Sequence, residues 1–156
     1  MVSMLINHFT LCSGVGHATG QHNAFDRALI AAGVSDYNLV QISSILPPQC
    51  VQEDKVLLPK GSLLPTAIAS IFSNNVGMRL SAAIAIGIPQ DSNDIGVIME
   101  HCTNLSKEET EELACTYARQ AMKDRHIKIK DIVSVSTECC VETPEYYCVF
   151  AAASLW

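Results

Sequence analysis

The stretch Asn38-Leu39-Val40-Gln41-Ile42-Ser43-Ser44-Ile45-Leu46-Pro47-Pro48 joins an apolar, strand-like run to two adjacent hydroxyls and two prolines. Pro47 restricts Leu46 to extended conformations, and neither proline can donate a hydrogen bond to a sheet. The pattern therefore predicts a strand that ends at Ser43-Ser44, with a stiff segment directly after it.

Two interpretations of Ser43-Ser44 remain open from these residues alone. One is a polar strand end that runs into a Pro-Pro turn. The other is self-cleavage, in which the Ser44 hydroxyl attacks the Ser43 carbonyl and the amide becomes an ester. Elimination would leave a carboxylate on Ser43 and, after loss of ammonia, a pyruvoyl group at position 44. The amide-to-ester step is uphill, so it needs local strain or stabilisation of the oxyanion.

Hydrophobic periodicity along the chain predicts an α+β fold. The expected strands are 5–13, 36–44, 63–73, 79–88, 95–99, 132–138 and 146–153, and the expected helices are 24–32 and 107–125. A polar segment at 49–62 is the natural place for a loop. This order indicates one domain in which helices lie outside packed sheets.

Glycines and caps set the boundaries near the N-terminal end. Gly14, Gly16 and Gly20 predict a loop after the first strand, without the spacing of a dinucleotide site or a Walker lysine. His17 and His22 are interpreted as solvated loop residues rather than ligands. Asn23 is expected to cap the first helix and Gly33 to end it, because Asn is common at helix N-caps and Gly just after helix ends.

Further turn and cap signals lie in the second half of the chain. Asn74-Asn75-Val76-Gly77 predicts a hairpin between its flanking strands, with a helix at 66–74 as the competing assignment. Ser106 and Glu109 form a capping-box pattern. The buried stripe of that helix is predicted as Leu113, Tyr117, Ala121 and Met122, with Glu108, Glu111, Glu112 and Lys123 facing water.

Composition argues against several classes of function. Hydrophobic residues make up 49% of the 156 residues and charged residues 17%, which suggests that some apolar surface faces other subunits. A net charge of −6 argues against a nucleic-acid partner. No apolar run reaches the roughly 18 residues of a membrane span, and residues 1–10 lack a signal peptide's basic start. Seven cysteines without a Cys-x-x-Cys pair predict free thiols in the cytoplasm and no metal site.

Two carboxylates are candidates for chemistry. Asp26 is predicted to lie in the first turn of its helix, where it either interacts with the helix dipole or accepts a guanidinium as a bidentate partner. Glu100 follows an apolar strand directly, so it is either a solvated strand-end residue or a partly desolvated acid able to deliver a proton.

The chain resembles the pyruvoyl-dependent arginine decarboxylases. The matching stretches are Asn23-Ala24-Phe25-Asp26, the run from Asn38 to Pro48, Leu63-Leu64-Pro65-Thr66-Ala67, Ser81-Ala82-Ala83-Ile84, Ile98-Met99-Glu100 and the residues from Phe150 to Trp156. They span nearly the whole chain in order, and the Ile-Ser-Ser-Ile-Leu-Pro-Pro run is the most specific. The resemblance implies a four-layer αββα sandwich that forms a homotrimer, or a larger assembly, with active sites between subunits.

The resemblance also implies a role for each candidate residue. Cleavage between Ser43 and Ser44 would give fragments 1–43 and 44–156, with a covalent pyruvoyl cofactor derived from Ser44 and no metal. Asp26 would hold the guanidinium of L-arginine, near the new carboxylate of Ser43. Glu100 would protonate the α-carbon after CO2 leaves, and Asn38 would assist processing or catalysis. The product would be agmatine. Because the reaction consumes a proton, polyamine supply and acid tolerance are both expected roles.

Three alternatives stay open at this stage. The substrate could be another amino acid, in particular another basic one. Ser44 could be a hydrolase nucleophile, although the sequence has no Gly-x-Ser-x-Gly elbow and no histidine in obvious reach. The chain could also be a catalytically silent trimeric binding protein of the same fold.

Overall fold

The computed structural model describes residues 6–156, so the first residue of the predicted strand 5–13 lies outside it. The elements are β1 (His8–Ala18), α1 (Gln21–Ala32), β2 (Asn38–Gln41), β3 (Ile45–Leu46), β4 (Val51–Gln52), β5 (Leu63–Ser73), β6 (Arg79–Pro89), β7 (Gly96–Thr103), α2 (Lys107–Asp124), β8 (Ile129–Cys140) and β9 (Tyr146–Leu155). No helix of the described part is long and apolar enough to cross a membrane.

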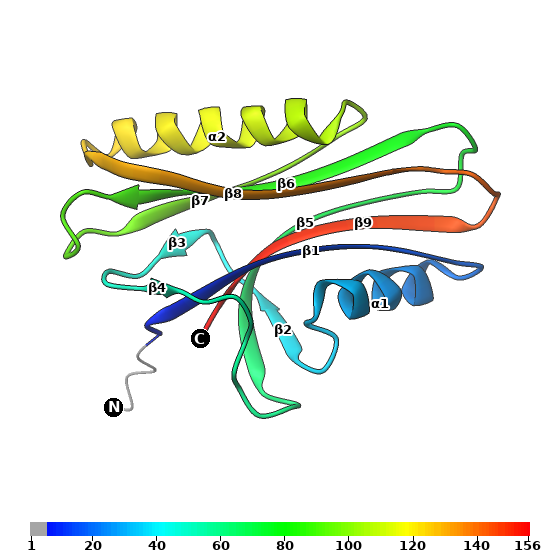
Figure 1. The fold of residues 1–156 in the computed structure, drawn as a ribbon, viewed down its shortest axis with the longest axis horizontal. Coiled ribbons are helices and arrows are strands. Elements are labelled where there is room, and N and C mark those ends of the chain that lie inside the picture. Colours follow the sequence, from blue (N-terminus) through cyan, green and yellow to red (C-terminus); the bar gives the residue numbers. More distant parts are fainter. Residues whose placement is uncertain (1–5) are drawn as a thin grey trace.

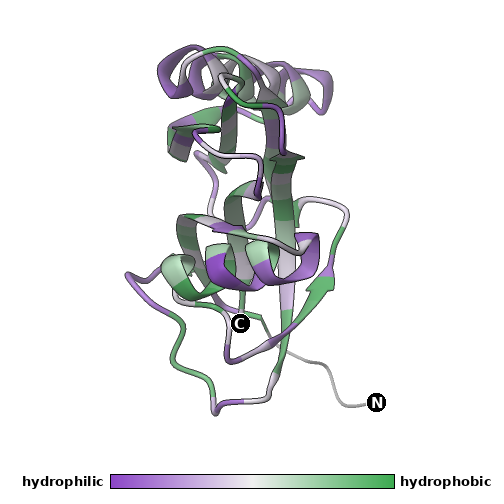
Figure 2. Cartoon of the chain, turned by 90° about the vertical axis from the view of Figure 1, so that its right-hand side faces the viewer, coloured by the Kyte–Doolittle hydropathy of each residue, from purple (hydrophilic) through white to green (hydrophobic). Residues whose placement is uncertain are grey.

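Two sheets pack face to face, and one helix covers each outer face (Figure 1). The larger sheet has the strand order β2-β5-β9-β1-β4 and the smaller one β3-β7-β6-β8. Helix α1 packs on β1 and β9, and α2 packs on β6, β7 and β8. Figure 2 shows the long strands as largely hydrophobic and both helices with hydrophilic stretches. The predicted α+β class and αββα layer order are therefore confirmed.

The predicted glycine loop is wrong, because β1 continues through Gly14 and Gly16 to Ala18. A Cβ added at Gly14 would overlap the backbone of Ala28. A Cβ added at Gly16 would overlap the backbone of both Ala24 and Ala28. The two glycines therefore let the backbone of α1 lie directly against the strand. Their spacing reflects helix–strand packing rather than a ligand loop.

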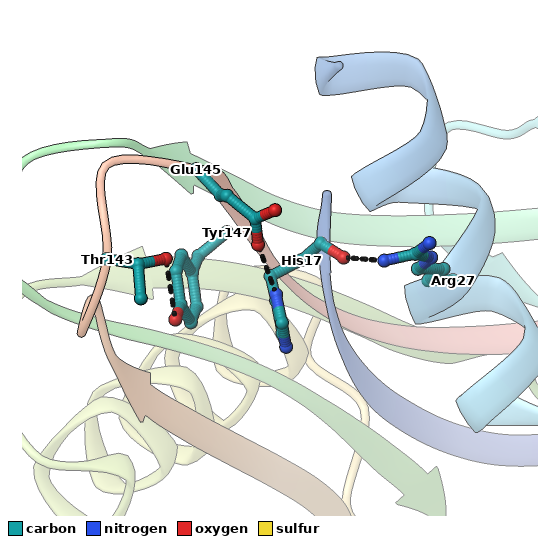
Figure 3. A network of polar contacts seen from close by, with 5 residues as sticks. All are labelled: His17, Arg27, Thr143, Glu145 and Tyr147. Atoms are coloured by element: carbon teal, nitrogen blue, oxygen red, sulfur yellow. Dashed lines mark hydrogen bonds and ion pairs between the residues drawn. The ribbon is translucent and has the colours of Figure 1, made fainter. Parts of the chain in front are cut away.

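The polar end of β1 is fixed by the network in Figure 3. His17 Nδ1 lies 2.8 Å from Glu145 Oε2, and the His17 ring stacks on Tyr147 at 4.9 Å between centroids. Arg27 Nη1 donates to the carbonyl of His17 at 2.6 Å. His17 is therefore a strand residue that links α1, β1 and the turn before β9, in contrast to the predicted loop residue.

The start of α1 also differs from the prediction. The helix begins at Gln21, with Gly20 as an N-cap that offers no side-chain hydrogen bond, so Asn23 lies inside the first turn. The Ala24 N–H donates to the Gly20 carbonyl at 3.0 Å and closes the first turn from Gly20. Gly33 ends the helix with φ 78°, as predicted.

The strand at 63–73 is confirmed, and the competing helix and the predicted hairpin are wrong. β5 and β6 belong to different sheets, so the turn at 74–77 carries the chain from one sheet to the other. Gly77 N–H donates to the Val141 carbonyl at 2.8 Å, and Val141 N–H donates to Met78 at 2.8 Å. The turn is thus held by the neighbouring crossover between β8 and β9 instead of closing a ladder.

The capping box of α2 is present, since the Ser106 and Glu109 side chains each bond the backbone of the other. The predicted stripe is only partly right, because Tyr117 is 43% exposed. The buried residues are Thr110, Ala114, Cys115, Ala118, Ala121 and Met122. Small residues fill most of this face, which lets α2 approach the sheet closely.

Glu111 does not face water as predicted. Its carboxylate accepts hydrogen bonds from Ser134 Oγ at 2.6 Å and Ser136 Oγ at 2.8 Å, both on β8. These serines give the carboxylate partners at the margin of the helix, so it is tolerated in a half-buried position.

The close approach of α1 to β1 makes Gly16 a stability determinant. We expect Gly16→Ala to lower the free energy of unfolding by about 3 kcal/mol, because the added methyl must push the α1 backbone away. Gly20→Ala is the matched control, since its Cβ would meet only Asn23 Oδ1 at 3.3 Å, and we expect it to cost less than about 1 kcal/mol. Urea unfolding of both variants tests this; equal stability would contradict it.

Candidate active site

The peptide bond between Ser43 and Ser44 lies where the chain passes from one sheet to the other, since β2 belongs to the larger sheet and β3 to the smaller. Upstream, Ile42 N–H donates to the Thr66 carbonyl of β5 at 3.2 Å. Downstream, Ile98 N–H of β7 donates to the Ser44 carbonyl at 2.9 Å. The backbone is therefore anchored to a different sheet on each side of this bond.

Ser44 has a left-handed backbone, with φ 67°. For a residue with a side chain this conformation costs about 1–2 kcal/mol. The anchors on both sides hold the residue there, so the local strain is maintained by the two sheets.

The Ser44 side chain points to a carboxylate. Ser44 Oγ donates a hydrogen bond to Glu100 Oε1, and both side chains are half-buried. The prediction that the strand ends at Glu100 is wrong, because β7 continues to Thr103. β3 pairs with β7 only at Gly96 and Val97. The change from apolar to polar residues therefore marks the loss of a neighbouring strand, not the end of β7.

Two hollows lie in this region, and only the first contains a residue of the Ser44–Glu100 pair. The first, of about 270 Å³, contains Glu100 in its wall and is lined by Gln41, Ile68, Ala69, Ser70, Glu100, His101 and Cys102. The second, of about 390 Å³, lies between α1 and β2 and is lined by Phe25, Leu29, Tyr37, Asn38, Leu39, Gln41 and Ile68. A small substrate that reacts at residue 44 would occupy the first hollow.

The structure does not bring Asn38 to this pair within one chain. Asn38 begins β2, so it lies about 10 Å beyond Gln41 on the side away from Ser44. Its side-chain nitrogen donates to the carbonyl of Gly61 at 2.8 Å. Asn38 therefore has a local partner and no contact with Glu100 here.

Asp26 is also separate from the Ser44–Glu100 pair. It is exposed on α1, the helix of the opposite outer layer from α2. The first turn of α1 contains no acidic residue, so the interpretation of Asp26 as a partner of the helix dipole is wrong. Within residues 6–156 its carboxylate has no hydrogen-bond or ion-pair partner.

The sequence interpretation missed part of the hollow beside Glu100. Gln41 could have been placed by alternation along β2, since it shares a face with Leu39 and Tyr37. Cys102 is an inert part of the wall, because burial raises the pKa of its thiol to about 11. No group of three metal-ligating side chains occurs in the described part of the chain.

Comparison with known proteins identifies the family. A family model described as pyruvoyl-dependent arginine decarboxylase matches residues 8–156. The chain belongs to this family. The pyruvoyl-dependent arginine decarboxylase of Methanococcus aeolicus is 39% identical over 150 residues, covering 96% of this chain and 90% of that protein. That of Methanocaldococcus jannaschii is 39% identical over 152 residues (97% and 91%), and that of Pyrococcus abyssi 37% over 122 residues (77% of each).

The residues around Ser44 fit the cofactor that the family name implies. A pyruvoyl group made from the chain itself needs a serine hydroxyl beside a proton acceptor, at a backbone position that cannot relax. The Ser44–Glu100 hydrogen bond, the left-handed φ and the two sheet anchors meet these needs.

The left-handed backbone at position 44 can be tested without cleavage. Neither Ser44→Gly nor Ser44→Ala has the hydroxyl, so both chains stay intact. We expect Ser44→Gly to be the more stable of the two by about 1 kcal/mol, because only glycine adopts positive φ without a steric cost. Thermal or urea unfolding compares them, and a more stable alanine variant would rule out strain at this residue.

Proposed function

We propose that this protein is a pyruvoyl-dependent arginine decarboxylase that cleaves itself between Ser43 and Ser44 and converts L-arginine to agmatine and CO2. The observation that carries the proposal is the hydrogen bond from Ser44 Oγ to Glu100 at a strained crossover between two sheets. Family membership supplies the reaction and the substrate class.

The proposed cleavage begins when Ser44 Oγ attacks the carbonyl carbon of Ser43. Glu100 accepts the hydroxyl proton, and the nitrogen of residue 44 receives a proton as its bond to Ser43 breaks. The resulting ester loses the α-proton of residue 44, its Cβ–O bond breaks, and Ser43 leaves as a carboxylate. Addition of one water and loss of one ammonia convert residue 44 to a pyruvoyl group. Release of backbone strain favours the first, uphill step.

The pyruvoyl group supplies an electron sink for the departure of CO2 from an amino acid. The chain's own residues do the rest. Glu100 stays beside residue 44 and delivers a proton to the substrate carbon, so one carboxylate serves both stages. The hollow next to Glu100 receives the substrate, and a net charge of −6 favours a cationic one.

We propose that the working unit is a homotrimer, or a larger assembly built from it, with sites between subunits. Asp26 and Asn38 have no contact with the Ser44–Glu100 pair of their own chain, so a neighbouring copy would supply them. There, Asp26 would hold the substrate guanidinium as a bidentate acceptor, and Asn38 would assist near residue 44. Val40 and Leu63, which are 45% and 64% exposed, provide apolar surface for such a contact. A cytoplasmic location suits the seven free cysteines.

The cleavage can be measured by intact mass. We expect the wild-type protein to separate in denaturant into fragments of 43 and 113 residues, the larger with a blocked amino end, and to form agmatine from arginine. In native buffer the fragments should stay together, because β1 lies between β9 and β4 in the larger sheet. Ser44→Ala should remain a single species of 16.9 kDa. A wild-type protein that stays intact would refute the proposal and favour a silent binding protein.

Sites between subunits can be tested by complementation. Asp26→Ala and Glu100→Gln should each be inactive alone, since one loses the guanidinium acceptor and the other the proton donor. When the two are co-expressed, about a quarter of the sites should combine a normal Asp26 with a normal Glu100 from different chains.

Agmatine formation by purified mixed assemblies measures this. A mixture of the separately assembled variants is the control, and it should stay inactive if the subunits do not exchange. Mixed assemblies as inactive as either variant would place all site residues in one chain and contradict the shared site.

A further inference from the structure

Gln41 lies where the two hollows meet. Among the residues in the wall beside Glu100, only Gln41 and Ile68 also line the hollow between α1 and β2. Gln41 is exposed, ends β2 and precedes Ser44 by three residues. Its amide is thus the polar side chain shared by both hollows, and within residues 6–156 it makes no hydrogen bond that would occupy it.

The backbone holds this side chain in a fixed direction. Gln41 pairs with Thr66 of β5, and the next residue is anchored to the same threonine through Ile42 N–H. Leu39, on the same face of β2, packs against the core beneath α1, as does Tyr37 just before the strand. Gln41 is therefore on the α1 side of the sheet, and its side chain lines both hollows.

The guanidinium of arginine needs more hydrogen-bond acceptors than one carboxylate provides. A guanidinium has five N–H donors in a planar fork, and a single carboxylate accepts only two of them. The remaining donors need further acceptors if the group leaves water. An ammonium presents three donors on a compact, rotatable head, so it makes no comparable planar demand.

We infer that Gln41 is a specificity residue whose side-chain oxygen accepts a hydrogen bond from the guanidinium of the substrate. The inference rests on the proposed function, since it names a contact of that same site. It adds a neutral acceptor to the carboxylate of Asp26.

The test compares steady-state kinetics of Gln41→Leu, Gln41→Glu and the wild type. Gln41→Leu removes the acceptor at similar volume, so KM for arginine should rise roughly tenfold with kcat unchanged. Gln41→Glu keeps an acceptor oxygen, so its KM should stay at or below the wild-type value. Gln52→Leu is the matched control, because Gln52 is exposed on β4, at the opposite edge of the larger sheet and outside both hollows, and it should behave as the wild type.

Intact mass gives the cleaved fraction of each variant, and the kinetic constants are calculated for that fraction alone. A change in substrate binding is thereby separated from a change in self-cleavage. If Gln41→Leu fails to cleave, Gln41→Asn replaces it, since it withdraws the same amide by one methylene and should also raise KM. An unchanged KM in the cleaved variant overturns the inference and leaves the proposed function intact. If the cleaved wild-type protein does not decarboxylate arginine, both the proposed substrate and the inference are wrong.

Discussion

The chain is anchored to two different sheets on either side of one peptide bond. Ile42 bonds Thr66 in the larger sheet, and Ser44 bonds Ile98 in the smaller one. Neither anchor can move without its sheet, and the two sheets share the main core of the molecule. The bond between Ser43 and Ser44 therefore cannot relax locally. Long ladders elsewhere stabilise a conformation that the dipeptide would not adopt on its own.

The same arrangement explains why a cut at this point need not unfold the protein. The segment before the bond contributes β1, α1 and β2, and β1 pairs along its whole length with β9 from the segment after it. Gly14 and Gly16 let α1 pack tightly over that pair. The contacts that hold the two segments together are thus mostly remote from the crossover. The strained position therefore lies away from most of the contacts between the two segments.

Sequence reasoning located the elements well where a local signal determines them. Strand 63–73, the glycine that ends α1 and the capping box of α2 all follow from short-range chemistry. The sequence predictions are wrong where a contact with a residue distant in the chain determines the structure. The glycines of β1 are explained only by the backbone of α1 above them, and the turn at 74–77 only by the crossover at Val141. Periodicity reports which residues are buried, but it cannot say which sheet a strand joins.

The candidate site likewise combines residues that the sequence predicts with contacts that it does not predict. The residues at 43, 44 and 100 were singled out from sequence, yet their contact depends on β3 bringing the crossover beside β7. Gln41 carries no motif, and only the geometry of the sheet edges places it in the wall of the hollow. Polar residues in short edge strands are common, so their identity alone does not predict a role.

The two short strands that anchor the crossover also create the space beside it. β2 pairs with β5 only as far as Thr66, and β3 pairs with β7 only at Gly96 and Val97. Beyond these points both long strands are uncovered, and the hollow is lined by residues 68–70 of β5 and 100–102 of β7. Unpaired strand edges can pair with or be covered by another chain. The geometry that strains the bond therefore also leaves an opening for a substrate and an uncovered surface that a neighbouring subunit would complete.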